Sequence, residues 1–397
     1  SKVNTNYYDK TLLSFFARAN YNYDNRYLLT ATVRTDGSTV FSNKNKWGFF
    51  PSFSAAWRVS EEAFMKDLKW ISNFKVRFGW GIVGNDRISN YLSMDLYTDN
   101  KYGIGNSTVT VLTPKQLKNS NLKWEGSSSV NLGLDLGFFD NRLNVTADFF
   151  IKNTKDLLLA QSLAQATGFT SQWQNIGKIQ NKGIELSITS TNIQTKEFTW
   201  NTNFNISFIR NELKALADGA SHMYGFDSNF TSYDYIAKVG ESLGLIYGYE
   251  FDGVYQYDDF YTDTNGNLVL KPGITQNSRY SKDKKVGARP GVTKYKDQDG
   301  DGIITTNDRT VIGNAMPKWF GGITNTFEYK GFDLSFMFQF NYGNDIYNAT
   351  RLYATQSRSG RRNMLAEVAD RWSPTNASNV VPAYDGYITN DVYSRFV

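Results

Sequence analysis

Apolar and polar side chains alternate along much of this chain. The clearest example begins at Phe74, which shares one face of an extended chain with Val76 and Phe78. Lys75 and Arg77 fall on the opposite face. A helix would scatter the same residues around its circumference, whereas a strand sorts them onto two faces. This segment is therefore predicted to be a β-strand with one apolar and one polar face.

The same period of two recurs in roughly a dozen segments, many of them close to the length of about ten residues at which a strand crosses a membrane. The clearest of the other segments are residues 26–34, 130–136, 143–151, 184–188, 198–208 and 332–342. The pattern predicts an all-β fold.

The connections between these segments are of two kinds. Some are very short and contain residues that tolerate turn conformations, which predicts tight hairpins and hence antiparallel strands. These turns are Asp24-Asn25, Asp140-Asn141, Lys196-Glu197 and Lys330-Gly331. Other connections are long and polar, at residues 82–126, 209–245 and 256–319. Short turns at one end of a sheet and long loops at the other are typical of an outer-membrane barrel.

Alternation alone does not separate a membrane barrel from a soluble β-sandwich, which buries its apolar faces against each other. Two features favour the membrane. The polar positions are rich in Asn, Thr, Ser, Asp and Arg, as the wall of a wet lumen would be. Aromatic residues gather near strand ends, at residues 47–50, 138–139 and 149–150, as in interfacial girdles. A transmembrane barrel is the preferred interpretation, and the soluble fold remains an alternative.

Composition removes several other classes. The 397 residues are 16% aromatic, which is too apolar for a disordered chain, and no apolar run approaches the roughly 18 residues that a spanning helix needs. The absence of cysteine excludes thiolate catalysis, zinc–thiolate sites and disulfides. The net charge of +5 is spread without a basic tract, so no nucleic-acid partner is expected. No signal peptide is visible and both ends look cut, which suggests a fragment of a larger protein.

One local motif carries more than the alternation. Aspartates stand at alternate positions at the start of residues 297–308, followed by a glycine, and the last residue is again a carboxylate. This is the spacing of a calcium loop, in which alternate carboxylates converge on one cation. The predicted ligands are Asp297, Asp299, Asp301, the backbone carbonyl of Ile303, and Asp308. An Asx-rich turn without metal explains the same residues. A bound calcium ion would be structural, ordering a long loop, and no cofactor is required.

The sequence contains no recognisable catalytic constellation. The only histidine, His222, lies in a polar segment, and a solvated loop histidine explains it better than a catalytic triad does. Gly79, Gly81 and Gly84 match a phosphate-loop spacing, but no helical pattern follows them. The protein is therefore not expected to be an enzyme.

Several segments taken together resemble the SusC/RagA family of TonB-linked outer-membrane transporters from Bacteroidetes-type bacteria. Their order and spacing are similar to those of the family over nearly the whole chain. Besides the aspartate loop, the segments are 51–65 (PSFSAAWRVSEEAFM), 74–85 (FKVRFGWGIVGN), 175–186 (NIGKIQNKGIEL), 312–322 (IGNAMPKWFGG) and 329–334 (YKGFDL). The family loop more often has Asn where Asp299 stands in this chain.

The resemblance implies that residues 1–397 are part of one transmembrane β-barrel domain, a segment of a barrel of about 22 strands with a plugged lumen. It also implies location in the outer membrane, contact with its lipid, and import of oligosaccharides or peptides. The implied partners are TonB, acting through an N-terminal plug region that this chain lacks, and a SusD-like surface lipoprotein over the extracellular mouth. The choice between glycan and peptide cargo stays open.

Other functions have to be distinguished from import: a passive porin, an outer-membrane barrel enzyme and a soluble carbohydrate-binding β protein. The loop residues Tyr233, Tyr235, Tyr255 and Tyr257 are candidates for stacking on sugars, although they could equally anchor the loops or contact the lipoprotein. Separated from the rest of a wide barrel, the segment would have open strand edges, so it is not expected to fold stably alone.

Overall fold

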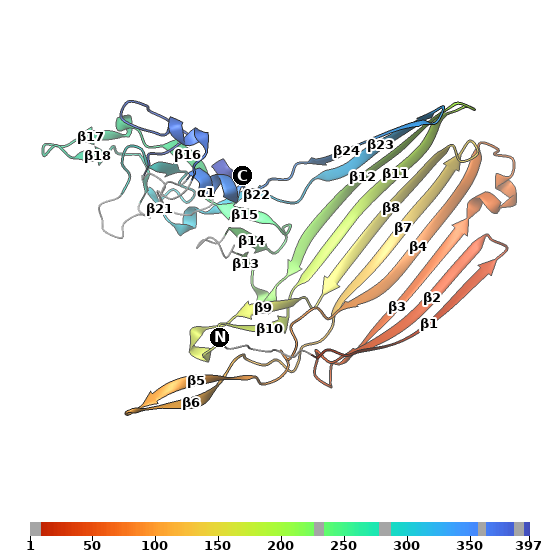
Figure 1. The fold of residues 1–397 in the computed structure, drawn as a ribbon, viewed down its shortest axis with the longest axis horizontal. Coiled ribbons are helices and arrows are strands. Elements are labelled where there is room, and N and C mark those ends of the chain that lie inside the picture. Colours follow the sequence, from red (N-terminus) through yellow and green to blue (C-terminus); the bar gives the residue numbers. More distant parts are fainter. Residues whose placement is uncertain (1–8, 226–233, 278–286, 356–362, 385–392) are drawn as a thin grey trace. The chain divides into compact units, whose positions relative to one another are not determined.

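The computed structural model describes residues 9–225, 234–277, 287–355, 363–384 and 393–397. Its main element is a ten-stranded sheet with the strand order β1-β2-β3-β4-β7-β8-β11-β12-β23-β24 (Figure 1). These strands are β1 (Leu12–Tyr23), β2 (Tyr27–Ser38), β3 (Trp47–Arg58), β4 (Ile71–Asn85), β7 (Glu125–Phe138), β8 (Leu143–Lys155), β11 (Lys178–Gln194), β12 (Phe198–Ala215), β23 (Trp319–Tyr329) and β24 (Phe332–Tyr342). The pairings are antiparallel, which confirms the predicted all-β, antiparallel fold.

The strand register aligns apolar side chains into rows that cross the sheet. One row runs through five neighbouring strands, each residue directly opposite the next, and consists of Phe78, Leu132, Phe149, Ile184 and Phe208. Each of these side chains is between 41 and 54% exposed. A soluble sandwich would bury such a row against a second sheet. The row is instead open, as the surface of a barrel that faces lipid should be.

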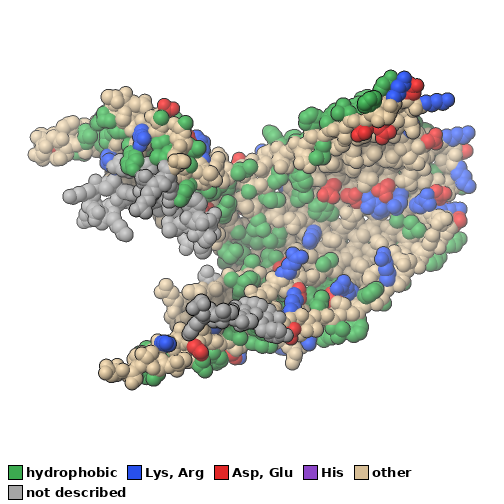
Figure 2. Space-filling model, in the orientation of Figure 1, with side chains coloured by type: hydrophobic (Ala, Val, Ile, Leu, Met, Phe, Trp, Pro, Cys, Tyr) green, Lys and Arg blue, Asp and Glu red, His purple; other side chains and the backbone are tan. Residues whose placement is uncertain are grey.

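The adjacent row, on the other side of the sheet, is polar. Arg77 on β4, Asp148 on β8, Glu185 on β11 and Ser207 on β12 stand in register, with Gly133 of β7 between the first two. We call this side of the sheet the polar face and the side carrying Leu132 the apolar face. Lys, Arg, Asp and Glu side chains gather on the sheet face visible in Figure 2. The two faces reproduce the alternation predicted from the sequence.

The two ends of the sheet differ, as predicted. At one end the strands are joined by tight turns, and Asp24, Asn25, Asp140 and Asn141 adopt the left-handed conformation that Asp and Asn tolerate. We call this the short-turn end. It also holds the connection 59–70, which contains the 3-10 helices η1 (Val59–Glu61) and η2 (Ala63–Met65).

The long-loop end carries residues 39–46, 86–124, 156–177 and 216–318 as connections. Up to residue 221 the elements described in them are β5 (Tyr97–Ile104), β6 (Ser107–Pro114), β9 (Leu158–Ser162), β10 (Ser171–Asn175), η3 (Gln165–Thr167) and η4 (Ala217–Gly219). Phe41, Leu122 and Leu158 form a buried cluster between three of these loops. The indole N–H of Trp124 donates to the carbonyl of Lys46 at 3.0 Å. The first three loops are therefore packed against one another.

Residues His222–Pro317 and Tyr342–Val397 form a second compact unit, distinct from the unit that contains the sheet. Its described strands are short: β13 (His222–Gly225), β14 (Tyr235–Lys238), β15 (Leu245–Gly248), β16 (Phe251–Val254), β17 (Phe260–Thr262), β18 (Leu268–Leu270), β19 (Gln276–Asn277), β20 (Thr293–Tyr295), β21 (Ile303–Ile304) and β22 (Thr310–Asn314). Its described helices are α1 (Ala349–Thr355), η5 (Tyr257–Asp259), η7 (Thr306–Asp308), η8 (Ala366–Asp370) and η9 (Ser394–Phe396). None of the described helices is long and apolar enough to cross a membrane.

The core of the second unit is aromatic. The rings of Tyr249 and Tyr295 stack at 4.9 Å between centroids, and Tyr393 meets Tyr295 edge-on at 5.5 Å. Leu352 and Phe396 are buried in the same cluster. The second unit therefore has a hydrophobic core of its own, and the assignment of all 397 residues to one barrel domain stays a prediction.

The loop boundaries expected from the sequence need two corrections. The segment 209–245 does not begin as a loop, because β12 continues to Ala215 and stays paired with β11. Polar residues such as Arg210 and Glu212 interrupt the alternation there, but the backbone ladder does not require apolar side chains. Likewise β4 extends through Asn85, paired with Glu125, into the segment 82–126.

Candidate functional site

The polar face holds a network of ion pairs on β4, β7 and β8. Arg77 donates through Nε and Nη2 to the two carboxylate oxygens of Asp135, at 2.9 and 3.0 Å. Its Nη2 also donates to Asp148 at 3.1 Å, and the ammonium nitrogen of Lys75 lies 3.2 Å from Asp135. These groups are half-buried and mutually satisfied. They therefore stabilise the polar face rather than present free charge to a ligand.

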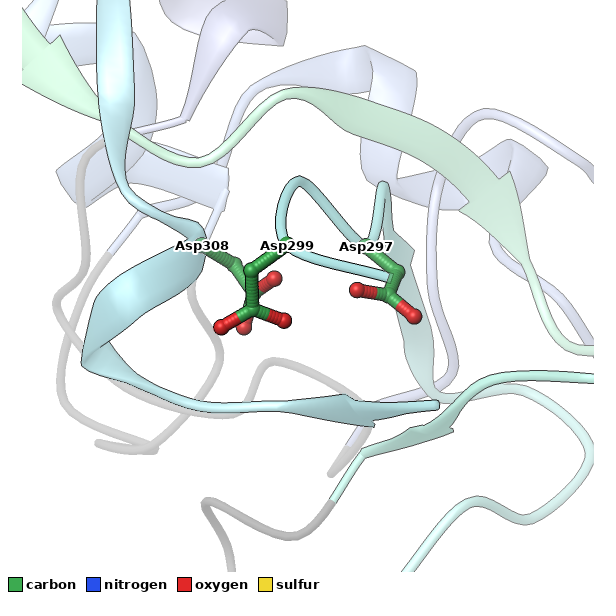
Figure 3. Close-up of side chains that lie close together, drawn as sticks. All are labelled: Asp297, Asp299 and Asp308. Atoms are coloured by element: carbon green, nitrogen blue, oxygen red, sulfur yellow. The ribbon is translucent and has the colours of Figure 1, made fainter. Parts of the chain in front are cut away.

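The aspartate loop brings together three of its predicted ligands (Figure 3). The carboxylates of Asp297, Asp299 and Asp308 each offer an oxygen, and these oxygens lie within 4.8 Å of one another. Asp308 is fully buried, whereas Asp299 is exposed. Carboxylate oxygens at such spacing are the ligands that Ca²⁺ prefers.

The fourth predicted carboxylate, that of Asp301, does not belong to this group of three. A carboxylate oxygen of Asp301 instead accepts a hydrogen bond from the amide of Ile303 at 2.7 Å. Ile303 belongs to β21, which pairs in parallel with β19. The structure thus assembles a smaller set of carboxylates than the spacing predicted.

Backbone amides also bind the clustered carboxylates. Asp297 accepts from the amides of Gly300 and Gly302 at 2.7 and 2.8 Å. The amide of Gly302 helps to hold the pKa of Asp297 below its ordinary value. Asp308 accepts from the amides of Gln298 and Thr305 at 2.8 and 2.6 Å. The loop is therefore an Asx-rich turn in its hydrogen bonding, and it also brings three carboxylates together.

The loop tyrosines that are candidates for sugar stacking separate into different environments. Tyr255 is completely buried in the core of the second unit, and its ring packs edge-on against Phe260 at 6.2 Å. Its candidacy for stacking is therefore wrong, because no face of the ring is open. Tyr235 and Tyr257 are exposed, and Tyr233 lies outside the described residues.

His222 lies in the short strand β13 rather than in a loop, and it is exposed. Its ring meets that of Tyr224 edge-on at 4.9 Å between centroids.

Sequence reasoning missed a polar anchor at the short-turn end. Glu62, in the connection 59–70, accepts hydrogen bonds from the hydroxyl of Tyr27 at 2.7 Å and from the indole of Trp57 at 3.0 Å. The hydrogen bond from Tyr27 is the main cause that lowers the pKa of Glu62. The carboxylate thus ties this connection to β2 and β3. The only signal for this anchor in the sequence is the presence of a tyrosine and a tryptophan near strand ends.

The open apolar rows, the polar face and the unequal ends of the sheet define part of the wall of a membrane β-barrel. The chain belongs to the family described as "TonB dependent receptor-like, beta-barrel", whose model matches residues 2–282. This confirms the predicted SusC/RagA-like membership and location in the outer membrane.

Relatives support the assignment. The chain is 39% identical over 353 residues to TonB-dependent receptor P39 of Formosa agariphila, covering 85% of this chain and 33% of that protein. It is 34% identical over 345 residues to TonB-dependent receptor SusC of Bacteroides thetaiotaomicron, covering 85% of this chain and 32% of SusC. The chain thus spans about a third of the length of these curated relatives.

Among solved structures, the RagAB peptide transporter matches with a TM-score of 0.74 at 25% identity. The match covers 94% of this chain and 38% of the RagAB chain. The RagAB importer in its "open-open" state matches with a TM-score of 0.75, over 96% of this chain.

Proposed function

We propose that this chain forms part of the barrel wall and the extracellular loops of a TonB-dependent importer of oligosaccharides or peptides. The observation that carries the proposal is the sheet itself: open apolar rows on one face, ion-paired and polar rows on the other, and long loops at one end only. A TonB-driven importer needs a lipid-facing wall around a polar lumen. Membership in the TonB-dependent receptor-like family supports the same function.

The proposed partners are TonB and a SusD-like surface lipoprotein. The similarity to SusC and to RagAB supports this pairing. The RagAB structures are of a peptide importer, whereas this chain's cargo class is left at oligosaccharide or peptide. In the proposed role the chain binds and guides cargo and performs no chemistry on it.

A passive porin is the main alternative, because it would have the same two-faced wall. Energy dependence distinguishes the two functions. In the bacterium that encodes this chain, we expect uptake of labelled oligosaccharide or peptide pools to fall to the background rate when the gene for the full-length protein is deleted. Deletion of tonB should give the same loss, since TonB supplies the energy.

The control for this experiment is re-expression of the full-length protein in both deletion strains. It should restore uptake only where TonB is present. Uptake that depends on the protein but persists without TonB would establish a porin and overturn the proposal. Recovery of the full-length protein in the aqueous fraction without detergent would favour the soluble carbohydrate-binding alternative.

We also propose that the aspartate loop binds a structural Ca²⁺ through Asp297, Asp299 and Asp308. The clustering of the three carboxylate oxygens supports this. We expect Ca²⁺ to slow proteolysis within residues 293–314 of the full-length protein and EDTA to reverse the effect. Asp308→Asn should weaken Ca²⁺ binding by about tenfold or more, because one ligand charge is lost. Tb³⁺ luminescence measures this binding.

Asp263→Asn is the matched control. Asp263 accepts from the amides of Asn265 and Asn267 in a comparable turn but does not belong to the clustered carboxylates. Its replacement should leave Ca²⁺ binding unchanged. Equal proteolysis with Ca²⁺ and with EDTA would identify residues 297–308 as a metal-free Asx turn.

A further inference from the structure

The polar face contains a recess of about 340 Å³ where β12, β23 and β24 adjoin. Its lining includes Asn205, Phe320, Gly322, Thr324, Gln339 and Asn341. A Cβ on Gly322 would lie 3.1 Å from the carbonyl of Phe338 and within 4 Å of the side chains of Asn205 and Gln339. These groups therefore share one face of the sheet, and the missing side chain of Gly322 helps to hollow it.

The carboxamides of this recess are free. Among the residues that the structure describes, the side chains of Asn205, Gln339 and Asn341 have no hydrogen-bond partner, and all three are exposed. Elsewhere on the polar face carboxamides pair with each other, as Asn211 does with Asn181 at 2.7 Å. Each free carboxamide offers both a donor and an acceptor to a ligand.

The recess lies toward the long-loop end of the sheet. Gly322 is near the first residue of β23, and Asn341 is near the last residue of β24, whereas the turn between these strands is at the opposite end. In an importer this end faces the extracellular mouth. An incoming molecule therefore meets the recess early in its passage.

We propose that this recess is a cargo-contacting subsite for an uncharged oligosaccharide, an inference that rests on the import function proposed above. No lining residue carries a charge. The recess thus offers no counter-charge to the termini or ionised side chains of a peptide, or to an acidic sugar. Hydroxyl groups of a neutral sugar both donate and accept, which matches the carboxamides and Thr324. The half-buried ring of Phe320 supplies an apolar surface for the C–H face of a sugar ring.

The test uses the full-length protein purified in detergent and calorimetric titration with defined probes. Maltohexaose, laminarihexaose, xylohexaose and mannohexaose are the neutral sugars. Hexagalacturonate and a short Ala-Ser peptide with free, charged termini are the comparison probes. We expect at least one neutral sugar to bind. The double variant Asn205→Ala with Gln339→Ala should weaken that binding by about 5- to 100-fold, because two hydrogen bonds are lost.

The matched control is the double variant Asn201→Ala with Asn203→Ala. These carboxamides lie on the same strand and face as Asn205 but outside the recess, nearer the short-turn end. Sugar binding by the control should equal that of the unaltered protein. An equal effect of both double variants overturns the subsite, as does binding of the acidic sugar or the peptide alone, or of no probe. TonB-dependent uptake of natural cargo would persist in each of those cases, which separates failure of the subsite from failure of the import function.

Discussion

Glu367 joins two arginines in the second unit. Arg351 donates to both carboxylate oxygens at 2.8 and 2.7 Å, and Arg395 donates to one of them at 2.9 Å. The adjacent Arg351 guanidinium lowers the pKa of Glu367 below its ordinary value. Because the pKa is lower in the folded state, ionised Glu367 stabilises the fold at neutral pH. That stabilisation is lost as pH falls below the unfolded value and through the folded pKa.

Glu367→Gln should therefore destabilise the second unit locally by roughly 1–3 kcal/mol at neutral pH, the range for hydrogen bonds to charged groups. Amide hydrogen exchange of α1 and η8 in the full-length protein, expressed as protection factors, measures the effect. The difference between variant and unaltered protein should shrink below about pH 4.5, where the unfolded carboxyl is protonated.

Glu241→Gln is the control for this substitution. Glu241 lies in the same unit and is exposed, and within the described structure it is not among the residues with an ion pair. Its replacement should leave the protection factors unchanged. Unaltered protection in Glu367→Gln at neutral pH would show that solvent screens the two arginine contacts more than their geometry suggests.

The strands behave as two-sided elements, and adjacent residues of β7 test this. Leu132 lies in the apolar row, and Asn131 points to the opposite face. In the membrane, Leu132→Arg should cost roughly 2–4 kcal/mol, because the guanidinium enters the lipid. Asn131→Arg places the same side chain in the polar lumen and should cost far less. The amount of heat-modifiable, folded full-length protein in the outer membrane measures both.

Equal loss of folded protein in the two variants would contradict the assigned faces. It would mean that β7 tolerates added bulk on neither side, irrespective of lipid. A smaller loss for Leu132→Arg than for Asn131→Arg would reverse the assignment of lumen and membrane.

The strands were predictable from sequence because a period of two is a local signal that lipid and water impose directly. The tight turns at Asp24 and Lys330 were predictable for the same reason, since residue type restricts turn geometry. The end of β12 was not predictable, because its last residues stay paired with β11 although their side chains no longer alternate between apolar and polar. The core of the second unit was not predictable either, since Tyr249, Tyr295 and Tyr393 pack together although they are far apart in the sequence.

In the candidate sites, too, local features could be predicted from the sequence, whereas contacts between distant segments could not. The alternate aspartates predicted the cluster of Asp297 and Asp299, because the spacing of ligands in a short loop depends only on neighbouring residues. The engagement of Asp301 with a backbone amide could not be read from that spacing. The carboxamide recess arises from three strands, of which β12 is separated from β23 by more than a hundred residues. Alternation places Asn205 on the polar face without indicating what lies beside it.

Among the described strands the sheet has two free edges, since β1 and β24 stand at the ends of the strand order. An edge strand exposes unpaired backbone N–H and C=O groups, and in lipid each unpaired group costs several kcal/mol. The apolar residues along β24, with Phe332 80% exposed, add a second route to aggregation. This chain spans about a third of the length of the curated relatives, and we expect the full-length protein to supply strands that pair with these edges.

Residues 1–397 expressed alone should therefore accumulate as aggregate, whereas the full-length protein should assemble in the outer membrane. Membrane fractionation and heat-modifiability on gels distinguish the two outcomes, and dilution of the aggregate from urea into lipid vesicles tests whether lipid alone rescues the segment. We expect the segment to be protease-sensitive both as the aggregate and after dilution into vesicles, because neither lipid nor detergent can satisfy the backbone of an open edge. A soluble, protease-resistant monomer of the segment would show that its edges are covered within these 397 residues, and the wall would then not depend on further strands.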